Sequence, residues 1–326
     1  MPPRAEEPPR EIAPGVILVD TGYLRPGGAA AYLVRGRRSA AVVETGTALS
    51  VPRILSALRQ HDMRPDEVSH VVVTHVHLDH AGGAGALLRE LPRATLVAHP
   101  RGARHMIDPS GLVAGAAAVY GGEEALRRIY GEIAAAPAER VVEAPDGFVL
   151  DLGERPLRFL DAPGHAKHHF VVHDEATRGF FAGDTFGVSY RETDGSNGPF
   201  MFPTTTPIQF DPPSLHASID RMLAERPTRM YLTHFGMVEG AIERRAEDLH
   251  RAIEEHVRVA LAAPAGPGRH ESIRRGLEEQ LLRSLAAHGF AGGSAEALSL
   301  FAGDLDLNAQ GLEFWLAMRG KARSPG

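Results

Sequence analysis

Four potential metal ligands lie within six residues of this chain. Residues 74–83 are THVHLDHAGG, in which His75, His77, Asp79 and His80 follow an apolar run and precede a glycine-rich turn. Given the chain's own histidine and aspartate content, an HxHxDH string is expected by chance roughly twice in a thousand such chains, so the motif is specific. The sequence has no cysteine, and any metal must therefore be bound by nitrogen and oxygen. The motif predicts a loop that supplies ligands to one metal ion or two.

Three further candidate ligands follow other apolar runs. His165 occurs in DAPGHAKHH, Asp184 in FFAGDTFG and His234 in MYLTHFG, and each comes after a segment expected to be a strand. A site for two metal ions needs more ligands than one loop offers, and these should come from strand ends that point into the same cleft. A single histidine at a strand end is more often structural, but the HxHxDH loop favours metal binding.

The ordered series THVHLDH, PGH, GDT and THFG resembles the metallo-β-lactamase superfamily over about residues 15–238. The resemblance implies an α/β fold, the four-layer αβ/βα sandwich, with metals at one edge of its two sheets. It also implies how the ligands divide, with one ion on His75, His77 and His165, the other on Asp79, His80 and His234, and Asp184 bridging them.

Some positions refine this resemblance. His80 matches glyoxalase II, lactonase and phosphodiesterase-like members and disfavours antibiotic hydrolysis. PGHAKHH is similar to the PGHTxGH of glyoxalase II and lactonase-like members, with His169 as the trailing histidine and His168 where glycine is usual. Glu44 in VVETG replaces the family's usual aspartate, a residue expected to hydrogen-bond to the ligand loop.

The expected reaction is hydrolysis of an ester-type bond in a small molecule. Two divalent ions that share Asp184 would lower the pKa of a bridging water and provide a hydroxide at neutral pH, with Asp79 as the catalytic side chain that orients it. A thioester, lactone or carboxylic ester is the first expectation and a phosphodiester the next. Zinc is the expected metal, with iron or manganese as alternatives because nitrogen and oxygen ligands accept all of them.

Three other functions remain open on the sequence alone. A protein that resembles persulfide dioxygenases would place a single iron on His75, His77 and His165. An RNA-processing nuclease would share HxHxDH, but the chain has no Lys/Arg-rich surface segment that would suit it. A signalling or binding module would retain the metal fold and use its helical C-terminal part for partner contact.

Composition narrows the class of protein. The chain has 326 residues, 43% of them hydrophobic and 23% charged, as in an ordinary globular protein. The net charge of −6 disfavours nucleic acid and anionic lipid as partners, and no apolar run has membrane-spanning length. The segment MPPRAEEPPR lacks the apolar core of a secretory signal, which favours a cytoplasmic location.

The elements follow from hydrophobic periodicity. Short apolar runs between Gly15 and Gly46 predict a strand meander, residues 51–61 a helix, VSHVVVTHVH a buried strand and residues 111–135 a helical excursion. Residues 141–187, beginning with VVEAP, are expected to form a second sheet. SLHASIDRMLAER predicts a helix and RMYLTHFG one last strand.

Three parts are predicted: a flexible tail (1–12), a catalytic domain of the metallo-β-lactamase fold (13–238) and a helical C-terminal region (239–326). Apolar stripes in the helical region must be buried on the sandwich or on another chain, so a homodimer is expected. Substrate choice is expected to depend on residues 111–135, on the irregular stretch 189–213 or on the C-terminal helices. Within that stretch, FPTTTPIQFD forms a pocket wall or braces the last helix, and Lys167, Tyr190 and Arg191 are candidate substrate contacts.

Overall fold

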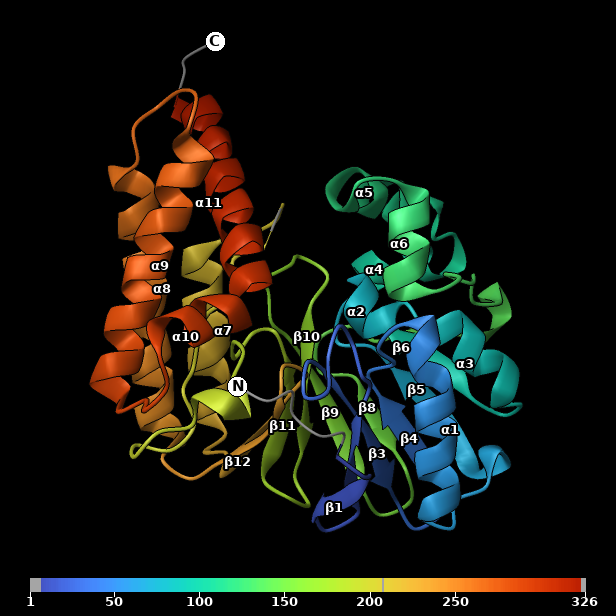
Figure 1. The fold of residues 1–326 in the computed structure, drawn as a ribbon. Coiled ribbons are helices and arrows are strands. Elements are labelled where there is room, and N and C mark those ends of the chain that lie inside the picture. Colours follow the sequence, from blue (N-terminus) through green and yellow to red (C-terminus); the bar gives the residue numbers. More distant parts are fainter. Residues whose placement is uncertain (1–6, 207, 324–326) are drawn as a thin grey trace.

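The computed structural model describes residues 7–206 and 208–323. Two sheets pack face to face, and helices cover both outer sides (Figure 1). This arrangement confirms the expected α/β sandwich with helices at its C-terminal end.

The first sheet has seven strands in the order β1-β2-β3-β4-β5-β6-β7. These strands are β1 (Arg10–Ala13), β2 (Val16–Asp20), β3 (Ala30–Arg35), β4 (Ala40–Val43), β5 (Val68–Val72), β6 (Thr95–Ala98) and β7 (Val141–Glu143). β1 to β4 are antiparallel neighbours, whereas β4 to β7 pair in parallel. Parallel neighbours require crossover connections, and helices in those connections cover the outer face of this sheet.

The second sheet has six strands in the order β13-β12-β11-β10-β9-β8. These strands are β8 (Val149–Asp151), β9 (Pro156–Asp161), β10 (Phe170–Asp174), β11 (Gly179–Gly183), β12 (Arg229–Leu232) and β13 (Gly236–Glu239). β9 and β11 both run antiparallel to β10, and β12 runs parallel to β11. The carboxyl ends of β9, β11 and β12 therefore lie at one edge of the sheet.

The helices lie on the two outer sides of the sheets and beyond β13. They are α1 (Val51–Gln60), α2 (Leu78–Ala81), α3 (Ala84–Glu90), α4 (Pro100–Ile107), α5 (Ser110–Tyr120), α6 (Glu123–Tyr130), α7 (Pro212–Ala224), α8 (Ile242–Ala262), α9 (Arg269–His288), α10 (Ser294–Leu300) and α11 (Ala302–Arg323). Single 3-10 turns occur at Ala48–Ser50, Pro65–Glu67, Ala138–Arg140 and Arg191–Thr193. No helix in the described ranges is both long and apolar enough to cross a bilayer.

Successive side chains of the central strands point alternately into two hydrophobic cores, one on each face of the sheet. In β2, Val16 and Leu18 belong to the cluster between the sheets, which also contains Phe159, whereas Ile17 and Val19 belong to the cluster under α1 and α3. Successive side chains of a strand point to opposite faces, so a continuous apolar run is expected where both faces of a sheet are covered. Both faces of this strand are fully buried.

The structure differs from the sequence expectations at several boundaries. β1 begins at Arg10, inside the segment predicted as a tail, of which residues 1–6 lie outside the described residues. VVEAP does not open the second sheet, because β7 pairs in parallel with β6 of the first sheet. RMYLTHFG forms β12 and the start of β13 rather than one strand, since the chain reverses at His234.

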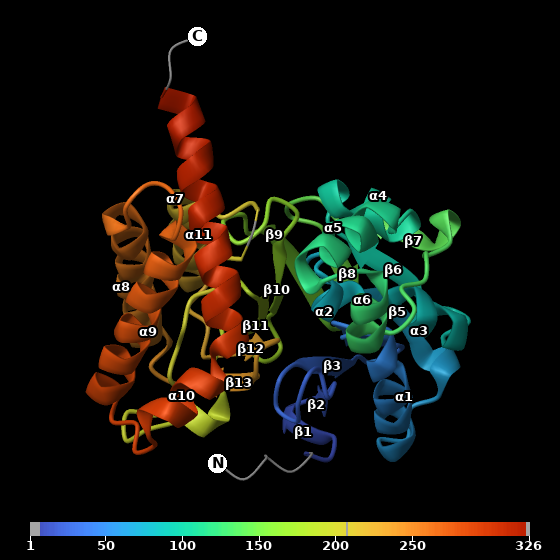
Figure 2. The same cartoon turned by 45° about the horizontal axis from the view of Figure 1, so that its top comes forward.

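The C-terminal helices pack within the chain. α11 lies against α8 and α9 (Figure 2). Phe301, Leu305 and Leu312 are fully buried in the same cluster as the inter-sheet residues, and Trp315 and Leu316 pack against it. The apolar stripes are thus covered by this chain itself, and the homodimer stays a prediction.

His256 of α8 makes the stability of this packing depend on pH. Its side chain is fully buried, with the Phe202 ring 5.1 Å away between ring centroids, and burial lowers the pKa of His256 to about 4 from its ordinary 6.5. Between these values the unfolded chain binds a proton at His256 and the folded chain does not, so acid favours unfolding.

We expect His256→Leu to flatten the decline in unfolding free energy between pH 6.5 and pH 4. The wild-type protein should lose up to about 3 kcal/mol more than the variant over this range, because one pKa unit corresponds to about 1.4 kcal/mol. Urea denaturation of both proteins at several pH values measures the difference. Parallel pH profiles would contradict the expectation.

Candidate metal centre

The seven predicted ligands converge where the two sheets meet. His75, His77, Asp79 and His80 follow β5, and the other three residues follow β9, β11 and β12. Because the carboxyl ends of these strands lie at the same edge, residues far apart in the sequence reach one place. The strand predicted to run through His77 ends at Val72 instead, and His77 precedes the short helix α2, which carries Asp79 and His80.

Three groups of potential ligand atoms occur in the part of the chain that the structure describes. Within each group the atoms lie no more than 4.8 Å from one another. The groups are His75, His77 and His165; His75, His80 and Asp184; and Asp79, His80 and His234. The structure thus brings together all seven residues that the sequence predicted.

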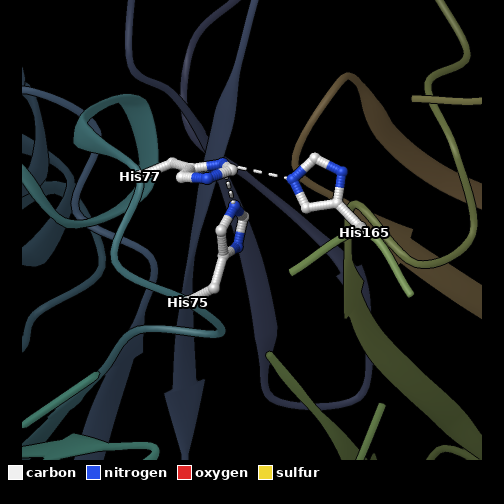
Figure 3. Close-up of side chains that lie close together, drawn as sticks. All are labelled: His75, His77 and His165. Atoms are coloured by element: carbon white, nitrogen blue, oxygen red, sulfur yellow. Dashed lines mark hydrogen bonds between the residues drawn. The ribbon is translucent and has the colours of Figure 1, made fainter. Parts of the chain in front are cut away.

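The first group consists of three imidazoles whose nitrogens face each other (Figure 3). His77 Nδ1 lies 2.8 Å from His75 Nε2 and 3.1 Å from His165 Nε2. Burial lowers the pKa of His75 and of His77 well below the ordinary value, and the neighbouring imidazoles lower it further. Neutral rings with converging nitrogens are the form in which histidine binds a metal.

Asp184 lies between the two halves of the site. Its Oδ2 is 3.5 Å from His165 Nε2, and its Oδ1 is 3.3 Å from His80 Nε2 and 3.8 Å from His234 Nε2. Burial by itself would raise the pKa of Asp184, but the adjacent imidazoles of His80 and His165 offset this and hold it well below the usual range. The carboxylate is ionised and reaches both groups of histidines.

The remaining ligand candidates surround His80. His234 Nε2 is 3.2 Å from Asp79 Oδ2, which is also 3.7 Å from His80 Nε2. Burial opposes a charge on His80, yet Asp184, Asp79 and Glu44 raise its pKa well above the ordinary value. Several carboxylates around one buried imidazole indicate a position suited to a cation.

Orphaned polar atoms support a metal at this place. Both ring nitrogens of His80 and Oδ1 of Asp184 are buried and make no hydrogen bond. Buried polar atoms are almost always satisfied in folded proteins, and those that are not call for an explanation such as an ion. The nitrogen and carboxylate donors match the ligand types of zinc and related divalent ions, so the residues present fit such a metal.

Glu44 braces the ligand loop, as the sequence predicted for this position. Its carboxylate is buried, accepts a hydrogen bond from the Thr74 hydroxyl and lies 3.4 Å from His80 Nδ1. Thr74 immediately precedes His75, so Glu44 contacts the loop from both ends of the HxHxDH motif.

Other side chains fix the ligands of the second sheet. His169 Nε2 accepts the Asp184 backbone N–H at 3.2 Å, which makes the trailing histidine of PGHAKHH a support for Asp184. His234 Nδ1 lies 2.9 Å from the Gly28 carbonyl oxygen and must donate to it, so Nε2 is left facing Asp79. His168 is buried, with its ring centroid 5.7 Å from that of His77, and belongs to none of the three groups.

A glycine is required beside His165. Gly164 has a φ of +132°, and a Cβ atom there would lie 2.3 Å from the backbone nitrogen of Leu215 at the start of α7. Any side chain would push this loop away from α7 and carry His165 with it. The glycine of the PGH motif therefore has a packing reason in this fold.

Tyr23, from the loop between β2 and β3, and Tyr130, at the end of α6 in the helical excursion, lie close enough to Asp79 to interact with it electrostatically. The hydroxyls of Tyr23 and Tyr130 are 2.9 Å apart, and the Tyr23 ring is 6.4 Å from the His234 ring between centroids. Burial raises the pKa of Tyr23 well above its ordinary value, so its phenol stays protonated. Sequence reasoning proposed the excursion as a substrate element but singled out neither Tyr130 within it nor Tyr23 outside it.

The other proposed substrate contacts are engaged elsewhere or exposed. The Tyr190 hydroxyl lies 3.2 Å from both carboxylate oxygens of Asp304 in α11, and Arg191 donates to the Ser189 carbonyl. Lys167 is exposed. FPTTTPIQFD contacts the last helix, since Asn308 of α11 accepts the Thr205 backbone N–H, and its role as a pocket wall stays a prediction.

The fold is an αβ/βα sandwich, and its histidines and carboxylates gather at the common edge of the two sheets. This combination is typical of a class of metal-binding proteins. Comparison with known proteins agrees, because the model of the metallo-beta-lactamase superfamily matches residues 24–234. The chain belongs to this superfamily.

Three relatives illustrate the range of similar proteins. A crystal structure of a metallo-beta-lactamase superfamily protein from Sulfolobus tokodaii superposes with a TM-score of 0.59 at 25% identity, over 84% of this chain and 98% of that one. The acyl-coenzyme A thioesterase MBLAC2 of Bos taurus is 27% identical over 54% of this chain and 64% of its own length. A hydroxyacylglutathione hydrolase of Cupriavidus taiwanensis is 32% identical over 62% of this chain and 61% of its own length.

Proposed function

We propose that this chain is a metal-dependent hydrolase that uses two divalent ions, zinc first, to cleave an ester-type bond in a small molecule. The observation that carries the proposal is the position of Asp184, whose two carboxylate oxygens face two different sets of histidines. The similarity to a named thioesterase and to a named hydroxyacylglutathione hydrolase favours a thioester, with lactones and carboxylic esters next. In this proposal residues 13–238 form the catalytic unit, and residues 239–326 are the helical region attached to it.

Seven side chains would hold the metals. One ion would be held by His75, His77 and His165, the other by Asp79, His80 and His234, with Asp184 shared between them. When bound, the ions would supply a water activated for attack at neutral pH and would polarise the carbonyl oxygen of the substrate.

Asp79 is the side chain best placed to orient the attacking water. It is 20% exposed, whereas His75 and His80 are fully buried, so it borders the accessible side of the site. Burial opposes ionisation, but His80 and a hydrogen bond from His234 hold the pKa of Asp79 well below its usual range. Asp79 Oδ2 faces the two histidines, which leaves Oδ1 as the oxygen that accepts a hydrogen bond from water.

Metal analysis and a substrate panel test this proposal together. We expect the purified protein to carry close to two divalent ions per chain, to lose its hydrolytic activity with a chelator and to regain it with zinc. Initial rates on an acyl thioester, a lactone, an aryl ester and bis-p-nitrophenyl phosphate should be highest for the thioester. About one iron per chain with oxygen uptake on a thiol substrate would instead support a dioxygenase.

A further inference from the structure

Thr204 contacts two of the proposed metal-binding residues at once. Its Oγ1 lies 2.8 Å from His165 Nδ1 and 3.2 Å from the backbone carbonyl oxygen of Asp184. The side chain is buried, and the neighbouring Thr206 hydroxyl is further from the ring, at 3.4 and 3.5 Å from its two nitrogens. Thr204 therefore makes the closer hydroxyl contact with His165.

The hydrogen-bonding capacity of each group determines which atom donates and which accepts. A carbonyl oxygen can only accept, so the single hydroxyl proton of Thr204 is donated to Asp184. His165 Nδ1 must then carry a proton and donate it to Thr204 Oγ1. The other nitrogen, Nε2, keeps its lone pair and faces His77 Nδ1 at 3.1 Å. Thr204 thus selects the tautomer of His165 that can bind a metal through Nε2.

The segment that carries Thr204 is held by the C-terminal helix. Asn308 of α11 accepts the Thr205 backbone N–H at 2.6 Å and donates to the Pro203 carbonyl at 2.9 Å. The Thr205 hydroxyl donates in turn to the Asn308 carbonyl at 3.1 Å. Asn308 is 1% exposed, and its side chain hydrogen-bonds to the backbone on both sides of Thr204.

Helix α11 approaches this segment so closely that position 311 has no room for a side chain. A Cβ atom on Gly311 would lie 1.6 Å from the Thr205 carbonyl oxygen. Helix α11 and residues 203–206 are therefore in backbone contact one turn after Asn308, which holds the segment against the helix.

We infer that Thr204 and Asn308 are positioning residues for His165, and that α11 is part of the metal centre although it supplies no ligand. Asn308 holds residues 203–206, Thr204 holds the ring of His165, and Nε2 is thereby kept available. The inference rests on the proposed function, since it assigns these residues to the metal site that function requires. Removal of a partner behind a metal-binding histidine typically lowers metal affinity about 10- to 100-fold.

Zinc affinity measured by chelator competition tests the inference without a substrate. Thr204→Val keeps the shape of the side chain and removes the hydroxyl, so it should weaken zinc binding about 10- to 100-fold, whereas Thr204→Ser should restore affinity close to the wild-type value. Asn308→Ala should weaken binding in the same direction. Gln310→Ala is the matched control on α11, because the Gln310 side chain donates to Asp306 of the same helix, and it should leave affinity unchanged.

A nitrogen-15 spectrum of the zinc-free histidines supplies a second readout. In the wild type His165 should be protonated at Nδ1, and Thr204→Val should shift it toward a mixture of tautomers, an effect that general destabilisation does not produce. Wild-type zinc affinity and an unchanged His165 spectrum in Thr204→Val would overturn the inference and leave the proposed function standing. A wild-type protein that binds no divalent metal would overturn the proposed function itself.

Discussion

Replacement of Asp184 by asparagine is expected to remove most of the bound metal and to lower the hydrolytic rate at least about a thousand-fold, because the loss of a single well-placed electrostatic group already costs 10²–10³. The substitution preserves the size of the side chain and removes its charge. Since the two oxygens of Asp184 face His165 on one side and His80 on the other, both halves of the site would lose a proposed ligand. Metal content per chain and initial rates on a thioester measure the two effects.

Asp161→Asn is the matched control for this experiment. Asp161 is the last residue of β9, four residues before His165, but its Oδ1 bonds to His99 at 3.0 Å and it belongs to none of the ligand groups. The control should retain its metal and its rate. An Asp184→Asn protein with normal metal content and normal rate would exclude the shared role of Asp184.

Replacement of Asp174 by alanine is expected to lower the free energy of unfolding by about 3–5 kcal/mol, the usual cost of leaving one member of a buried ion pair without its partner. Arg155 Nη2 lies 2.6 Å from Asp174 Oδ2, and Arg155 Nε lies 3.2 Å from Oδ1. The two side chains are 8% and 0% exposed. Arg155 also donates to the carbonyls of Pro14 and Arg35, so the pair joins the first sheet to the second.

Urea denaturation followed by circular dichroism measures this loss. Glu279→Ala is the control, because Glu279 pairs with Arg283 at 3.8 Å between side chains that are 65% and 60% exposed, and it should cost less than about 1 kcal/mol. The double replacement Arg155→Met with Asp174→Leu should be less damaging than Asp174→Ala, since no buried charge is left unpaired. A loss under about 1 kcal/mol for Asp174→Ala would contradict the assigned role of the pair.

Local periodicity predicted most elements of the fold. The helical spacing from Val51 predicts α1, because an apolar stripe at that spacing marks the buried face of a helix. The alanine-rich stretch 111–135 corresponds to α5 and α6, and alanine has the highest helix propensity. Local periodicity does not predict which strand a given strand pairs with. The sequence of β7 is β-prone, but only its place beside β6 puts it in the first sheet.

In the candidate site too, some features can be predicted from the sequence and others depend on the fold. The HxHxDH motif is contained in six residues, so its ligand types and spacing are visible without a fold, and the resemblance of PGH, GDT and THFG to known motifs located His165, Asp184 and His234. Their convergence depends on the parallel course of β9, β11 and β12, which brings three loops to one edge.

What the sequence by itself determined is therefore the set of ligand candidates and the strands and helices around them. The sequence also predicted the supporting role of Glu44, but only the tertiary structure showed that Thr204 and Asn308 stand behind the ligand candidates. The bonds of Asn308 to Pro203 and Thr205 span more than 100 positions, and Thr204 lies 39 positions from His165. A hydrogen bond between residues so far apart leaves no local periodicity, because it depends on how α11 packs and not on the spacing of neighbouring side chains.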